Sequence, residues 1–184
     1  MKLPIFMAAT LLVANIASAD APLVVVEENQ TVVQVNGMVC SFCAYGAEKA
    51  LSELDCLDRE EFSDGVLVDI DTHRITLALR PGEKIPLLDI YQRIKKAGYD
   101  PVAFYIRSEG TLELSAGRLL LRDAKSGQTF SIVGGEIEGV PDDARVTVQA
   151  SLIASQIPEL DADGVAKVTI DHLISESGKA REDG

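Results

Sequence analysis

Apolar and polar positions change their period in a regular way over residues 24–107. The pattern predicts a strand, a helix, two strands joined by a turn at Asp71-Thr72-His73, a second helix and a further strand. The predicted ranges are 30–35, about 41–54, 65–70, 74–79, about 87–97 and 102–106. This order, β-α-β-β-α-β, places both helices on one face of a four-stranded antiparallel sheet.

Alternation returns in five short stretches between residues 110 and 175, separated by turn signals rich in glycine, aspartate and proline. Five short strands with a longer third connection resemble a small closed barrel of the OB type, and another small barrel would fit as well. The fold class is therefore α+β, with a ferredoxin-like domain over 24–107 followed by an all-β, OB-like barrel over 110–175. The alternating apolar residues are Leu112, Leu114, Leu119, Leu121, Phe130, Ile132, Val146, Val148, Ala150, Val168, Ile170 and Leu173.

The two ends of the chain differ from this pattern. Lys2 is followed by an apolar run over 4–16 and by Ala17-Ser18-Ala19, which is typical of a signal peptide cleaved after Ala19. The run is shorter than the roughly 20 apolar residues that a spanning helix needs. We therefore expect residues 1–19 to direct export to a periplasm. Residues 176–184, rich in charge and glycine, predict a disordered tail.

The net charge and the number of cysteines limit the classes of function that fit this chain. The formal net charge is -12 without a basic stripe, which argues against nucleic-acid binding because phosphate neutralisation needs clustered Lys and Arg. The three cysteines are an odd set with two close together, so they do not form a disulfide framework. In an exported chain this pattern indicates metal or redox chemistry.

The close pair is Cys40 and Cys43, at the predicted junction of the first strand and the first helix. Unpaired N–H groups and the positive end of the helix dipole lower a thiol pKa there, which favours thiolate. Two thiolates suit one soft ion that accepts near-linear coordination, Cu(I) or Hg(II), whereas structural zinc prefers four ligands.

A family resemblance supports this site. The stretch Gly37-Met38-Val39-Cys40-Ser41-Phe42-Cys43 resembles the GMxCxxC signature of heavy-metal-associated domains, and Ala97-Gly98-Tyr99 before the last strand also matches. With the predicted signal peptide, the chain is most similar to periplasmic mercury-binding proteins and bacterial copper chaperones. The resemblance implies that Cys40 and Cys43 bind the metal. It also implies that Met38 packs into the core beneath the loop and that Tyr99 lies beside the metal loop and shields the ion.

Other residues near this motif have less specific interpretations. Cys56 lies thirteen residues after Cys43, about 20 Å along a helix, so it is expected to be a small apolar residue or to form an intermolecular disulfide. Val39 and Phe42 make the loop more apolar than is usual in the family, and they either shield the site or extend the core. His73 is interpreted as a solvated turn residue.

The leading hypothesis is a non-enzymatic carrier that passes its ion to a membrane transporter or to another CxxC protein by thiolate exchange. A thiol-disulfide oxidoreductase is the first alternative, because CxxC at a helix N-terminus is also a redox arrangement. A metal-dependent adaptor or sensor is the second. The barrel lacks cysteine and methionine, and its one histidine is His172, so it is expected to be a docking module or added bulk. The sequence predicts no oligomeric state.

Overall fold

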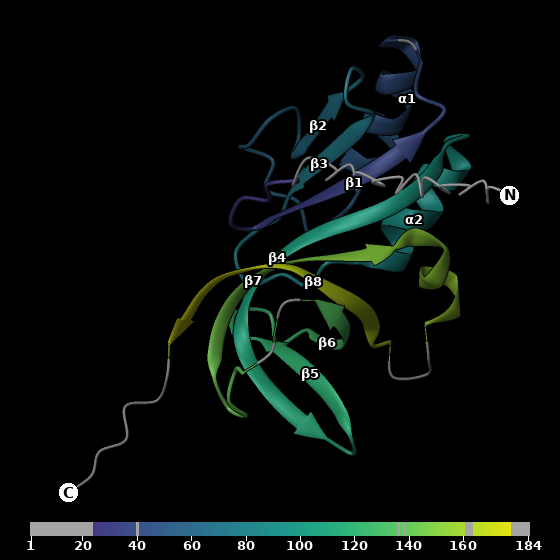
Figure 1. Cartoon of the computed structure of the whole chain (residues 1–184). Helices are drawn as coiled ribbons and strands as arrows, with labels where there is room; N and C mark the ends of the chain where they lie inside the picture. Colours follow the sequence, from purple (N-terminus) through teal and green to yellow (C-terminus); the bar gives the residue numbers. More distant parts are fainter. Residues whose placement is uncertain (1–23, 40, 136, 138, 161–163, 178–184) are drawn as a thin grey trace, which may run out of the picture.

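The computed structural model of the chain describes residues 24–39, 41–135, 137, 139–160 and 164–177. The predicted signal peptide and residues 178–184 lie outside the described residues. Eight strands form one sheet in the order β2-β3-β1-β4-β5-β6-β8-β7, accompanied by two α-helices and a short 3-10 helix (Figure 1). The described chain is therefore of mixed α and β structure, and the sheet dominates it. None of its described helices has the length and hydropathy of a membrane-spanning segment.

The first half has the predicted order of elements. All its strand pairings are antiparallel, in the order β2-β3-β1-β4, and both helices pack against this part of the sheet. Each helix turns an apolar stripe inward, made in α2 by Leu87, Ile90 and Ile94. The elements are β1 (Gln30–Asn36), α1 (Ser41–Ser52), β2 (Val66–Asp69), β3 (Arg74–Ala78), α2 (Leu87–Lys96) and β4 (Asp100–Ser115).

The second half contains the five strands expected from the sequence, the first of them being the later part of β4. Strands β4, β5, β6, β8 and β7 close on themselves, because β7 pairs with β4 as well as with β8. These pairings are antiparallel except that of β6 with β8, which is parallel. The assignment to the OB type stays a prediction. The further elements are β5 (Arg118–Asp123), β6 (Thr129–Gly135), β7 (Arg145–Ile153), the 3-10 helix η1 (Ala154–Glu159) and β8 (Ala166–Ser177). The first two residues of the predicted tail therefore belong to β8.

One prediction about the strands was wrong. The two strands expected around residues 102–106 and 112–114 are a single strand, β4, of 16 residues. The apolar alternation breaks in its middle because Ser108 and Gly110 occupy two buried, inward positions. The Ser108 hydroxyl is satisfied there by donating to Asp123 Oδ2 at 2.9 Å. A Cβ on residue 110 would lie 2.0 Å from the carbonyl oxygen of Arg122, so the approach of β5 requires glycine.

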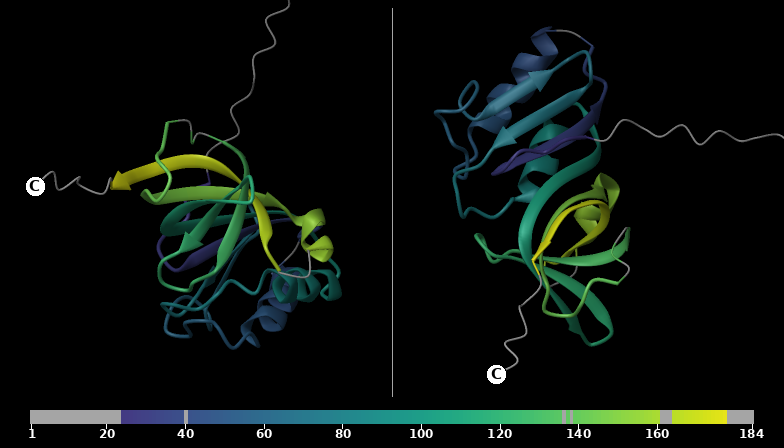
Figure 2. Two further views of the ribbon diagram at one scale, coloured as in Figure 1. Left: turned by 90° about the horizontal axis from the view of Figure 1, so that it is seen from below. Right: turned by 60° about the vertical axis from the view of Figure 1, so that its left-hand side comes forward.

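Both halves of the chain share β4. Its first part pairs with β1 on one side and with β7 on the other, so β7 covers the edge of the ferredoxin-like sheet (Figure 2). One cluster of buried apolar side chains extends from the two helices into the barrel strands. The division into domains at residues 107–110 stays a prediction, but within the described chain the two halves are joined by a continuous sheet and core.

A short N-terminal segment, residues 24–27, covers the sheet face opposite the helices. Val24 and Val26 pack there with Val32 and Tyr105 in a second apolar cluster. In the orientation that satisfies both groups, the side-chain amide of Gln149 donates to Val24 O at 2.9 Å and accepts from Val26 N–H at 3.3 Å. Since Gln149 belongs to β7, this segment links the barrel to the first half of the chain.

Replacing Val26 by alanine is expected to lower the free energy of unfolding by about 1.5 to 2.5 kcal/mol, because a fully buried side chain loses two methyl groups. Urea unfolding at equilibrium measures this change. Val25→Ala is the matched control, since the Val25 side chain is 64% exposed and its loss should cost less than about 0.5 kcal/mol. Equal effects of the two substitutions would contradict the packing of this segment.

Candidate metal centre

The loop between β1 and α1 begins with a residue that must be glycine. Gly37 has a φ of +92°, a conformation that side chains with a Cβ rarely adopt. A Cβ built on it would lie 3.8 Å from Cδ1 of Tyr99, so the Tyr99 ring lies against this glycine. Tyr99 is itself only 9% exposed, as expected of a residue that packs beside the loop.

The loop is held in place by Met38, whose side chain is fully buried in the main core cluster. This burial agrees with the packing role expected for it. Val39 is in contrast 78% exposed and Phe42 is 90% exposed. The idea that these two side chains extend the core was therefore wrong, because the chain turns them outward at the start of α1. Apolar groups thus lie at the surface on both sides of position 40.

The two predicted ligands are only partly described. Cys40 lies outside the described residues, and of Cys43 the structure describes the backbone, as the third residue of α1. That position is in the first helical turn, where N–H groups lack intrahelical partners and the dipole favours negative charge. No acidic residue occupies this turn. The prediction of a thiolate at this position rests on that backbone environment.

The turn between α2 and β4 lies beside the predicted metal loop, since Asn36 pairs with Asp100 in the sheet. Gly98, with a φ of +93°, ends α2, and the N–H of Tyr99 donates to Ile94 O at 3.2 Å. Residues 37–39 of the loop and the turn at 97–99 thus lie at the same end of β1 and β4. The tertiary structure brings Tyr99 to the predicted metal loop, as the sequence motif implied.

Cys56 lies beyond the far end of α1 from this loop, and its side chain is 9% exposed. Burial raises the pKa of its thiol, which disfavours thiolate at neutral pH. These observations agree with a small apolar residue. An intermolecular disulfide would need a sulfur that a second chain can reach, and burial opposes that.

His73 differs from its expected role. It closes the turn between β2 and β3 with a φ of +55°, and its carbonyl accepts from the N–H of Val35 at 2.9 Å. The residue is half-buried, and its Nδ1 is buried without a hydrogen-bond partner among the described residues. The interpretation as a solvated side chain was wrong because the residue lies beside Val35, a position that faces the core. His172 is exposed on β8, far along the chain from this turn.

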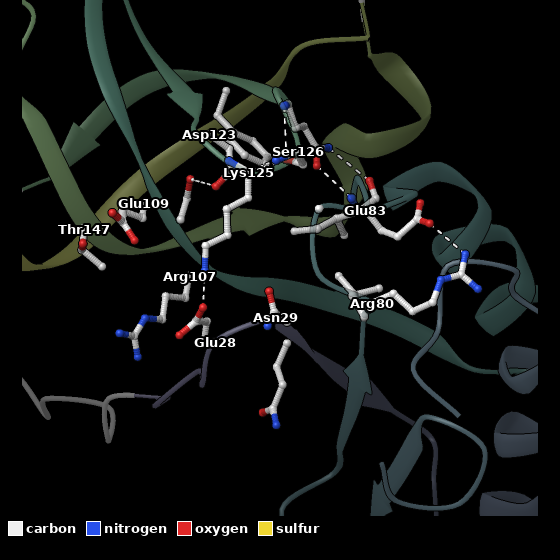
Figure 3. Close-up of a pocket in the computed structure, with 17 residues that line it drawn as sticks. Glu28, Asn29, Arg80, Glu83, Arg107, Glu109, Asp123, Lys125, Ser126 and Thr147 are labelled. Atoms are coloured by element: carbon white, nitrogen blue, oxygen red, sulfur yellow. Dashed lines mark hydrogen bonds and ion pairs between the residues drawn. The ribbon is translucent and has the colours of Figure 1, made fainter. Parts of the chain in front are cut away.

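Outside the loop, the described residues offer no alternative centre of the kind that three or more His, Cys, Asp or Glu side chains would form. A polar cavity of about 80 Å³ does lie where β4 passes between the two halves (Figure 3). Lys125 pairs with Glu28 beside it, and the hydrogen bond from its ammonium lowers the pKa of the Glu28 carboxyl. The Gln128 amide accepts from Ile85 N–H at 2.8 Å and donates to Ile85 O at 3.1 Å. The residues that line this cavity between the two halves include no cysteine or histidine. The cavity therefore offers no soft metal ligands.

Comparison with known proteins gives a partial likeness to a solved structure. No protein-family model matches the chain, and no curated protein matches it. Among solved structures, a CopZ metallochaperone is similar with 23% sequence identity and a TM-score of 0.34. The likeness covers 40% of this chain and 98% of that one. An overlap of this size leaves the function to be argued from the residues of this chain.

Proposed function

We propose that this protein is a non-enzymatic periplasmic carrier that binds one soft metal ion, Cu(I) or Hg(II), between the thiolates of Cys40 and Cys43. One observation supports the proposal most. The Gly37 turn and the buried Met38 fix the loop that leads into α1, whose first turn contains Cys43, while Val39 and Phe42 face solvent.

The donor chemistry supports a soft, two-coordinate ion. Thiolates select Cu(I) and Hg(II) over hard cations, and a pair of them satisfies an ion that accepts near-linear coordination. Structural zinc is usually held by four ligands, and the described residues contain no cluster of three or more metal-binding side chains to supply the rest. The ring of Tyr99, which is 9% exposed, packs against Gly37 on one side of the loop.

An exposed loop also suits transfer. A two-coordinate ion accepts an incoming third thiolate before it leaves the first pair, so it moves between proteins without being released to solvent. The acceptor is then a membrane transporter or another protein with a CxxC pair. Export by residues 1–19 places the exchange in the periplasm.

A competitive titration tests this function. The reduced, metal-free protein is titrated anaerobically with Cu(I), Hg(II) and Zn(II) against a chromophoric chelator. We expect one equivalent of Cu(I) or Hg(II) to bind far more tightly than Zn(II). Tighter binding of Zn(II), or two equivalents of Cu(I) per chain, would contradict the carrier. Turnover of the Cys40 and Cys43 pair on a disulfide-bonded protein substrate would favour the oxidoreductase.

A further inference from the structure

The polar cavity between the two halves is built from separate segments of the chain (Figure 3). They are the N-terminal segment, the loop from β3 to α2, strand β4, the turn from β5 to β6 and strand β7. Its volume of about 80 Å³ equals the room of roughly three water molecules, at about 30 Å³ each. Lys125 and Glu28 in its wall are 43% and 62% exposed, so solvent reaches it. The cavity can therefore admit a small polar molecule.

One cation in the wall of this cavity is not neutralised. Arg107 of β4 is half-buried, and among the described residues its side chain makes no ion pair and no hydrogen bond. Arg80, in contrast, pairs with Glu83 at 2.7 Å. Lys125 pairs with Glu28. A guanidinium presents five N–H donors in a planar fork that matches a carboxylate, so Arg107 is free to bind one.

Two glutamates in the wall keep unused acceptor atoms. Lys125 bonds Oε1 of Glu28. Arg145 bonds Oε1 of Glu109, from Nη2 at 2.9 Å and from Nε at 3.2 Å. Within the described chain, the Oε2 atoms of both glutamates accept no hydrogen bond. Because an ionised carboxylate has about four acceptor positions on its two oxygens, an ammonium group can bind here without breaking either pair.

The free cation and the free acceptor atoms lie close together. Arg107 and Glu109 are two residues apart on β4, so their side chains leave the same face of the strand, about 7 Å apart along it. Glu28 is near both cations, since the hydrogen bond from Lys125 and, to a smaller extent, the charge of Arg107 lower the pKa of its carboxyl (Figure 3). Groups of both signs are thus available on one side of the cavity.

We propose that this cavity binds a small zwitterion of the α-amino-acid class, about the size of glycine. Its carboxylate accepts hydrogen bonds from the Arg107 guanidinium, and its ammonium donates to the free oxygens of Glu28 and Glu109. A single carbon atom separates the two charged groups of such a ligand, and this short span matches side chains that neighbour each other on one strand face. An anion alone leaves the glutamate oxygens unused, and a cation alone leaves Arg107 unused.

This site is separate from the predicted metal loop. Gln30 in the cavity wall begins β1 and Gly37 follows the other end of that strand, so about 20 Å of strand lies between them. The proposal goes beyond the proposed function and does not depend on it. A variant that loses the zwitterion is therefore expected to keep its affinity for Cu(I).

The test titrates the reduced, metal-free protein with glycine and follows the amide chemical shifts. We expect saturable shifts confined to residues 28–30, 107–109 and 123–128. The dissociation constant should be on the order of 1 mM, because partly exposed ion pairs each contribute little. Acetate and methylammonium, at the same ionic strength, each carry one of the two charges and should bind at least about tenfold more weakly. Leucine should also bind more weakly, because its side chain exceeds the cavity.

Matched variants test the role of Arg107. Arg107→Gln should weaken glycine binding about tenfold, because the ligand loses its charged donor. Arg107→Lys keeps the charge and should retain part of the affinity. Arg118→Gln is the control, since Arg118 is exposed on β5 and does not line the cavity. The thermal unfolding midpoint of Arg107→Gln should match that of the control, because the substitution breaks no hydrogen bond of the described chain.

Several outcomes would overturn the proposal. Acetate that binds as tightly as glycine would identify an anion site, and methylammonium that does so would identify a cation site. Equal effects of Arg107→Gln and Arg118→Gln, or shifts confined to other parts of the chain, would contradict the assigned residues. Shifts that never saturate would show that the cavity holds water alone. The Cu(I) titration is a separate measurement, so failure of glycine binding leaves the carrier function standing, and failure of metal binding leaves this site standing.

Discussion

Replacing Cys43 by serine is expected to abolish tight binding of Cu(I). A serine hydroxyl stays protonated at neutral pH and is a hard donor, so one thiolate remains for an ion that needs two. The loss should exceed the roughly 100-fold that follows from removing a hydrogen bond to a metal ligand. Competition with a chromophoric Cu(I) chelator under anaerobic, reducing conditions measures it, and Cys40→Ser should behave in the same way.

Cys56→Ala is the matched control for this prediction. The Cys56 side chain is buried at the other end of α1, so its removal should leave the stoichiometry and affinity for Cu(I) unchanged. Circular dichroism of each variant shows that the fold is retained. A Cys43→Ser protein that still holds one tight equivalent would disprove the site, and so would loss of the ion in Cys56→Ala.

Replacing Gly110 by alanine is expected to lower the free energy of unfolding by about 3 kcal/mol or more, which is a large part of the stability of a small protein. The new Cβ would lie 2.0 Å from the carbonyl oxygen of Arg122 and 2.7 Å from its carbon, and both are backbone atoms that cannot turn aside. Strands β4 and β5 must separate to accommodate it. Chemical denaturation followed by far-UV circular dichroism measures the change.

The same glycine-to-alanine change at position 46 provides the control, with the opposite sign. Gly46 lies inside α1, where a Cβ meets nothing, so alanine should raise stability by about 0.5 to 1 kcal/mol. Because β4 belongs to both halves of the sheet, Gly110→Ala should also destabilise the two halves together in one transition. Separate transitions, with the first half unaffected, would contradict the shared strand.

The elements of the first half were predictable because their signals are local. The alternation around Val33 and Val35 and the inward stripe of Ile90 and Ile94 are each visible within a few residues of sequence. The continuity of β4 was not predictable in this way. Ser108 is acceptable inside because Asp123 accepts a hydrogen bond from its hydroxyl group, and that partner lies fifteen residues away in sequence. In the sequence, Ser108 and Gly110 therefore resembled the end of one strand and the start of the next.

The loop between β1 and α1 also has features that the sequence predicted and features that it did not. The sequence motif indicated the places of Met38 and Tyr99, because residues with buried partners are constrained by the fold that the motif specifies. The exposure of Val39 and Phe42 and the burial of His73 Nδ1 could not be read from residue type. Whether a side chain points inward depends on its register against a neighbouring strand or on the entry angle of a helix.

Local sequence patterns predicted the order of the elements, a cysteine pair at a strand-to-helix junction and the soft-metal chemistry expected of that pair. These follow from residue type and spacing along the chain. Only the three-dimensional contacts show that β7 covers the β4 edge, that Val24 and Val26 cover the sheet face, and that Arg93 pairs with both Glu53 and Asp89. The physical reason is that such contacts join residues far apart in sequence, and their energies depend on burial and distance that no local pattern contains.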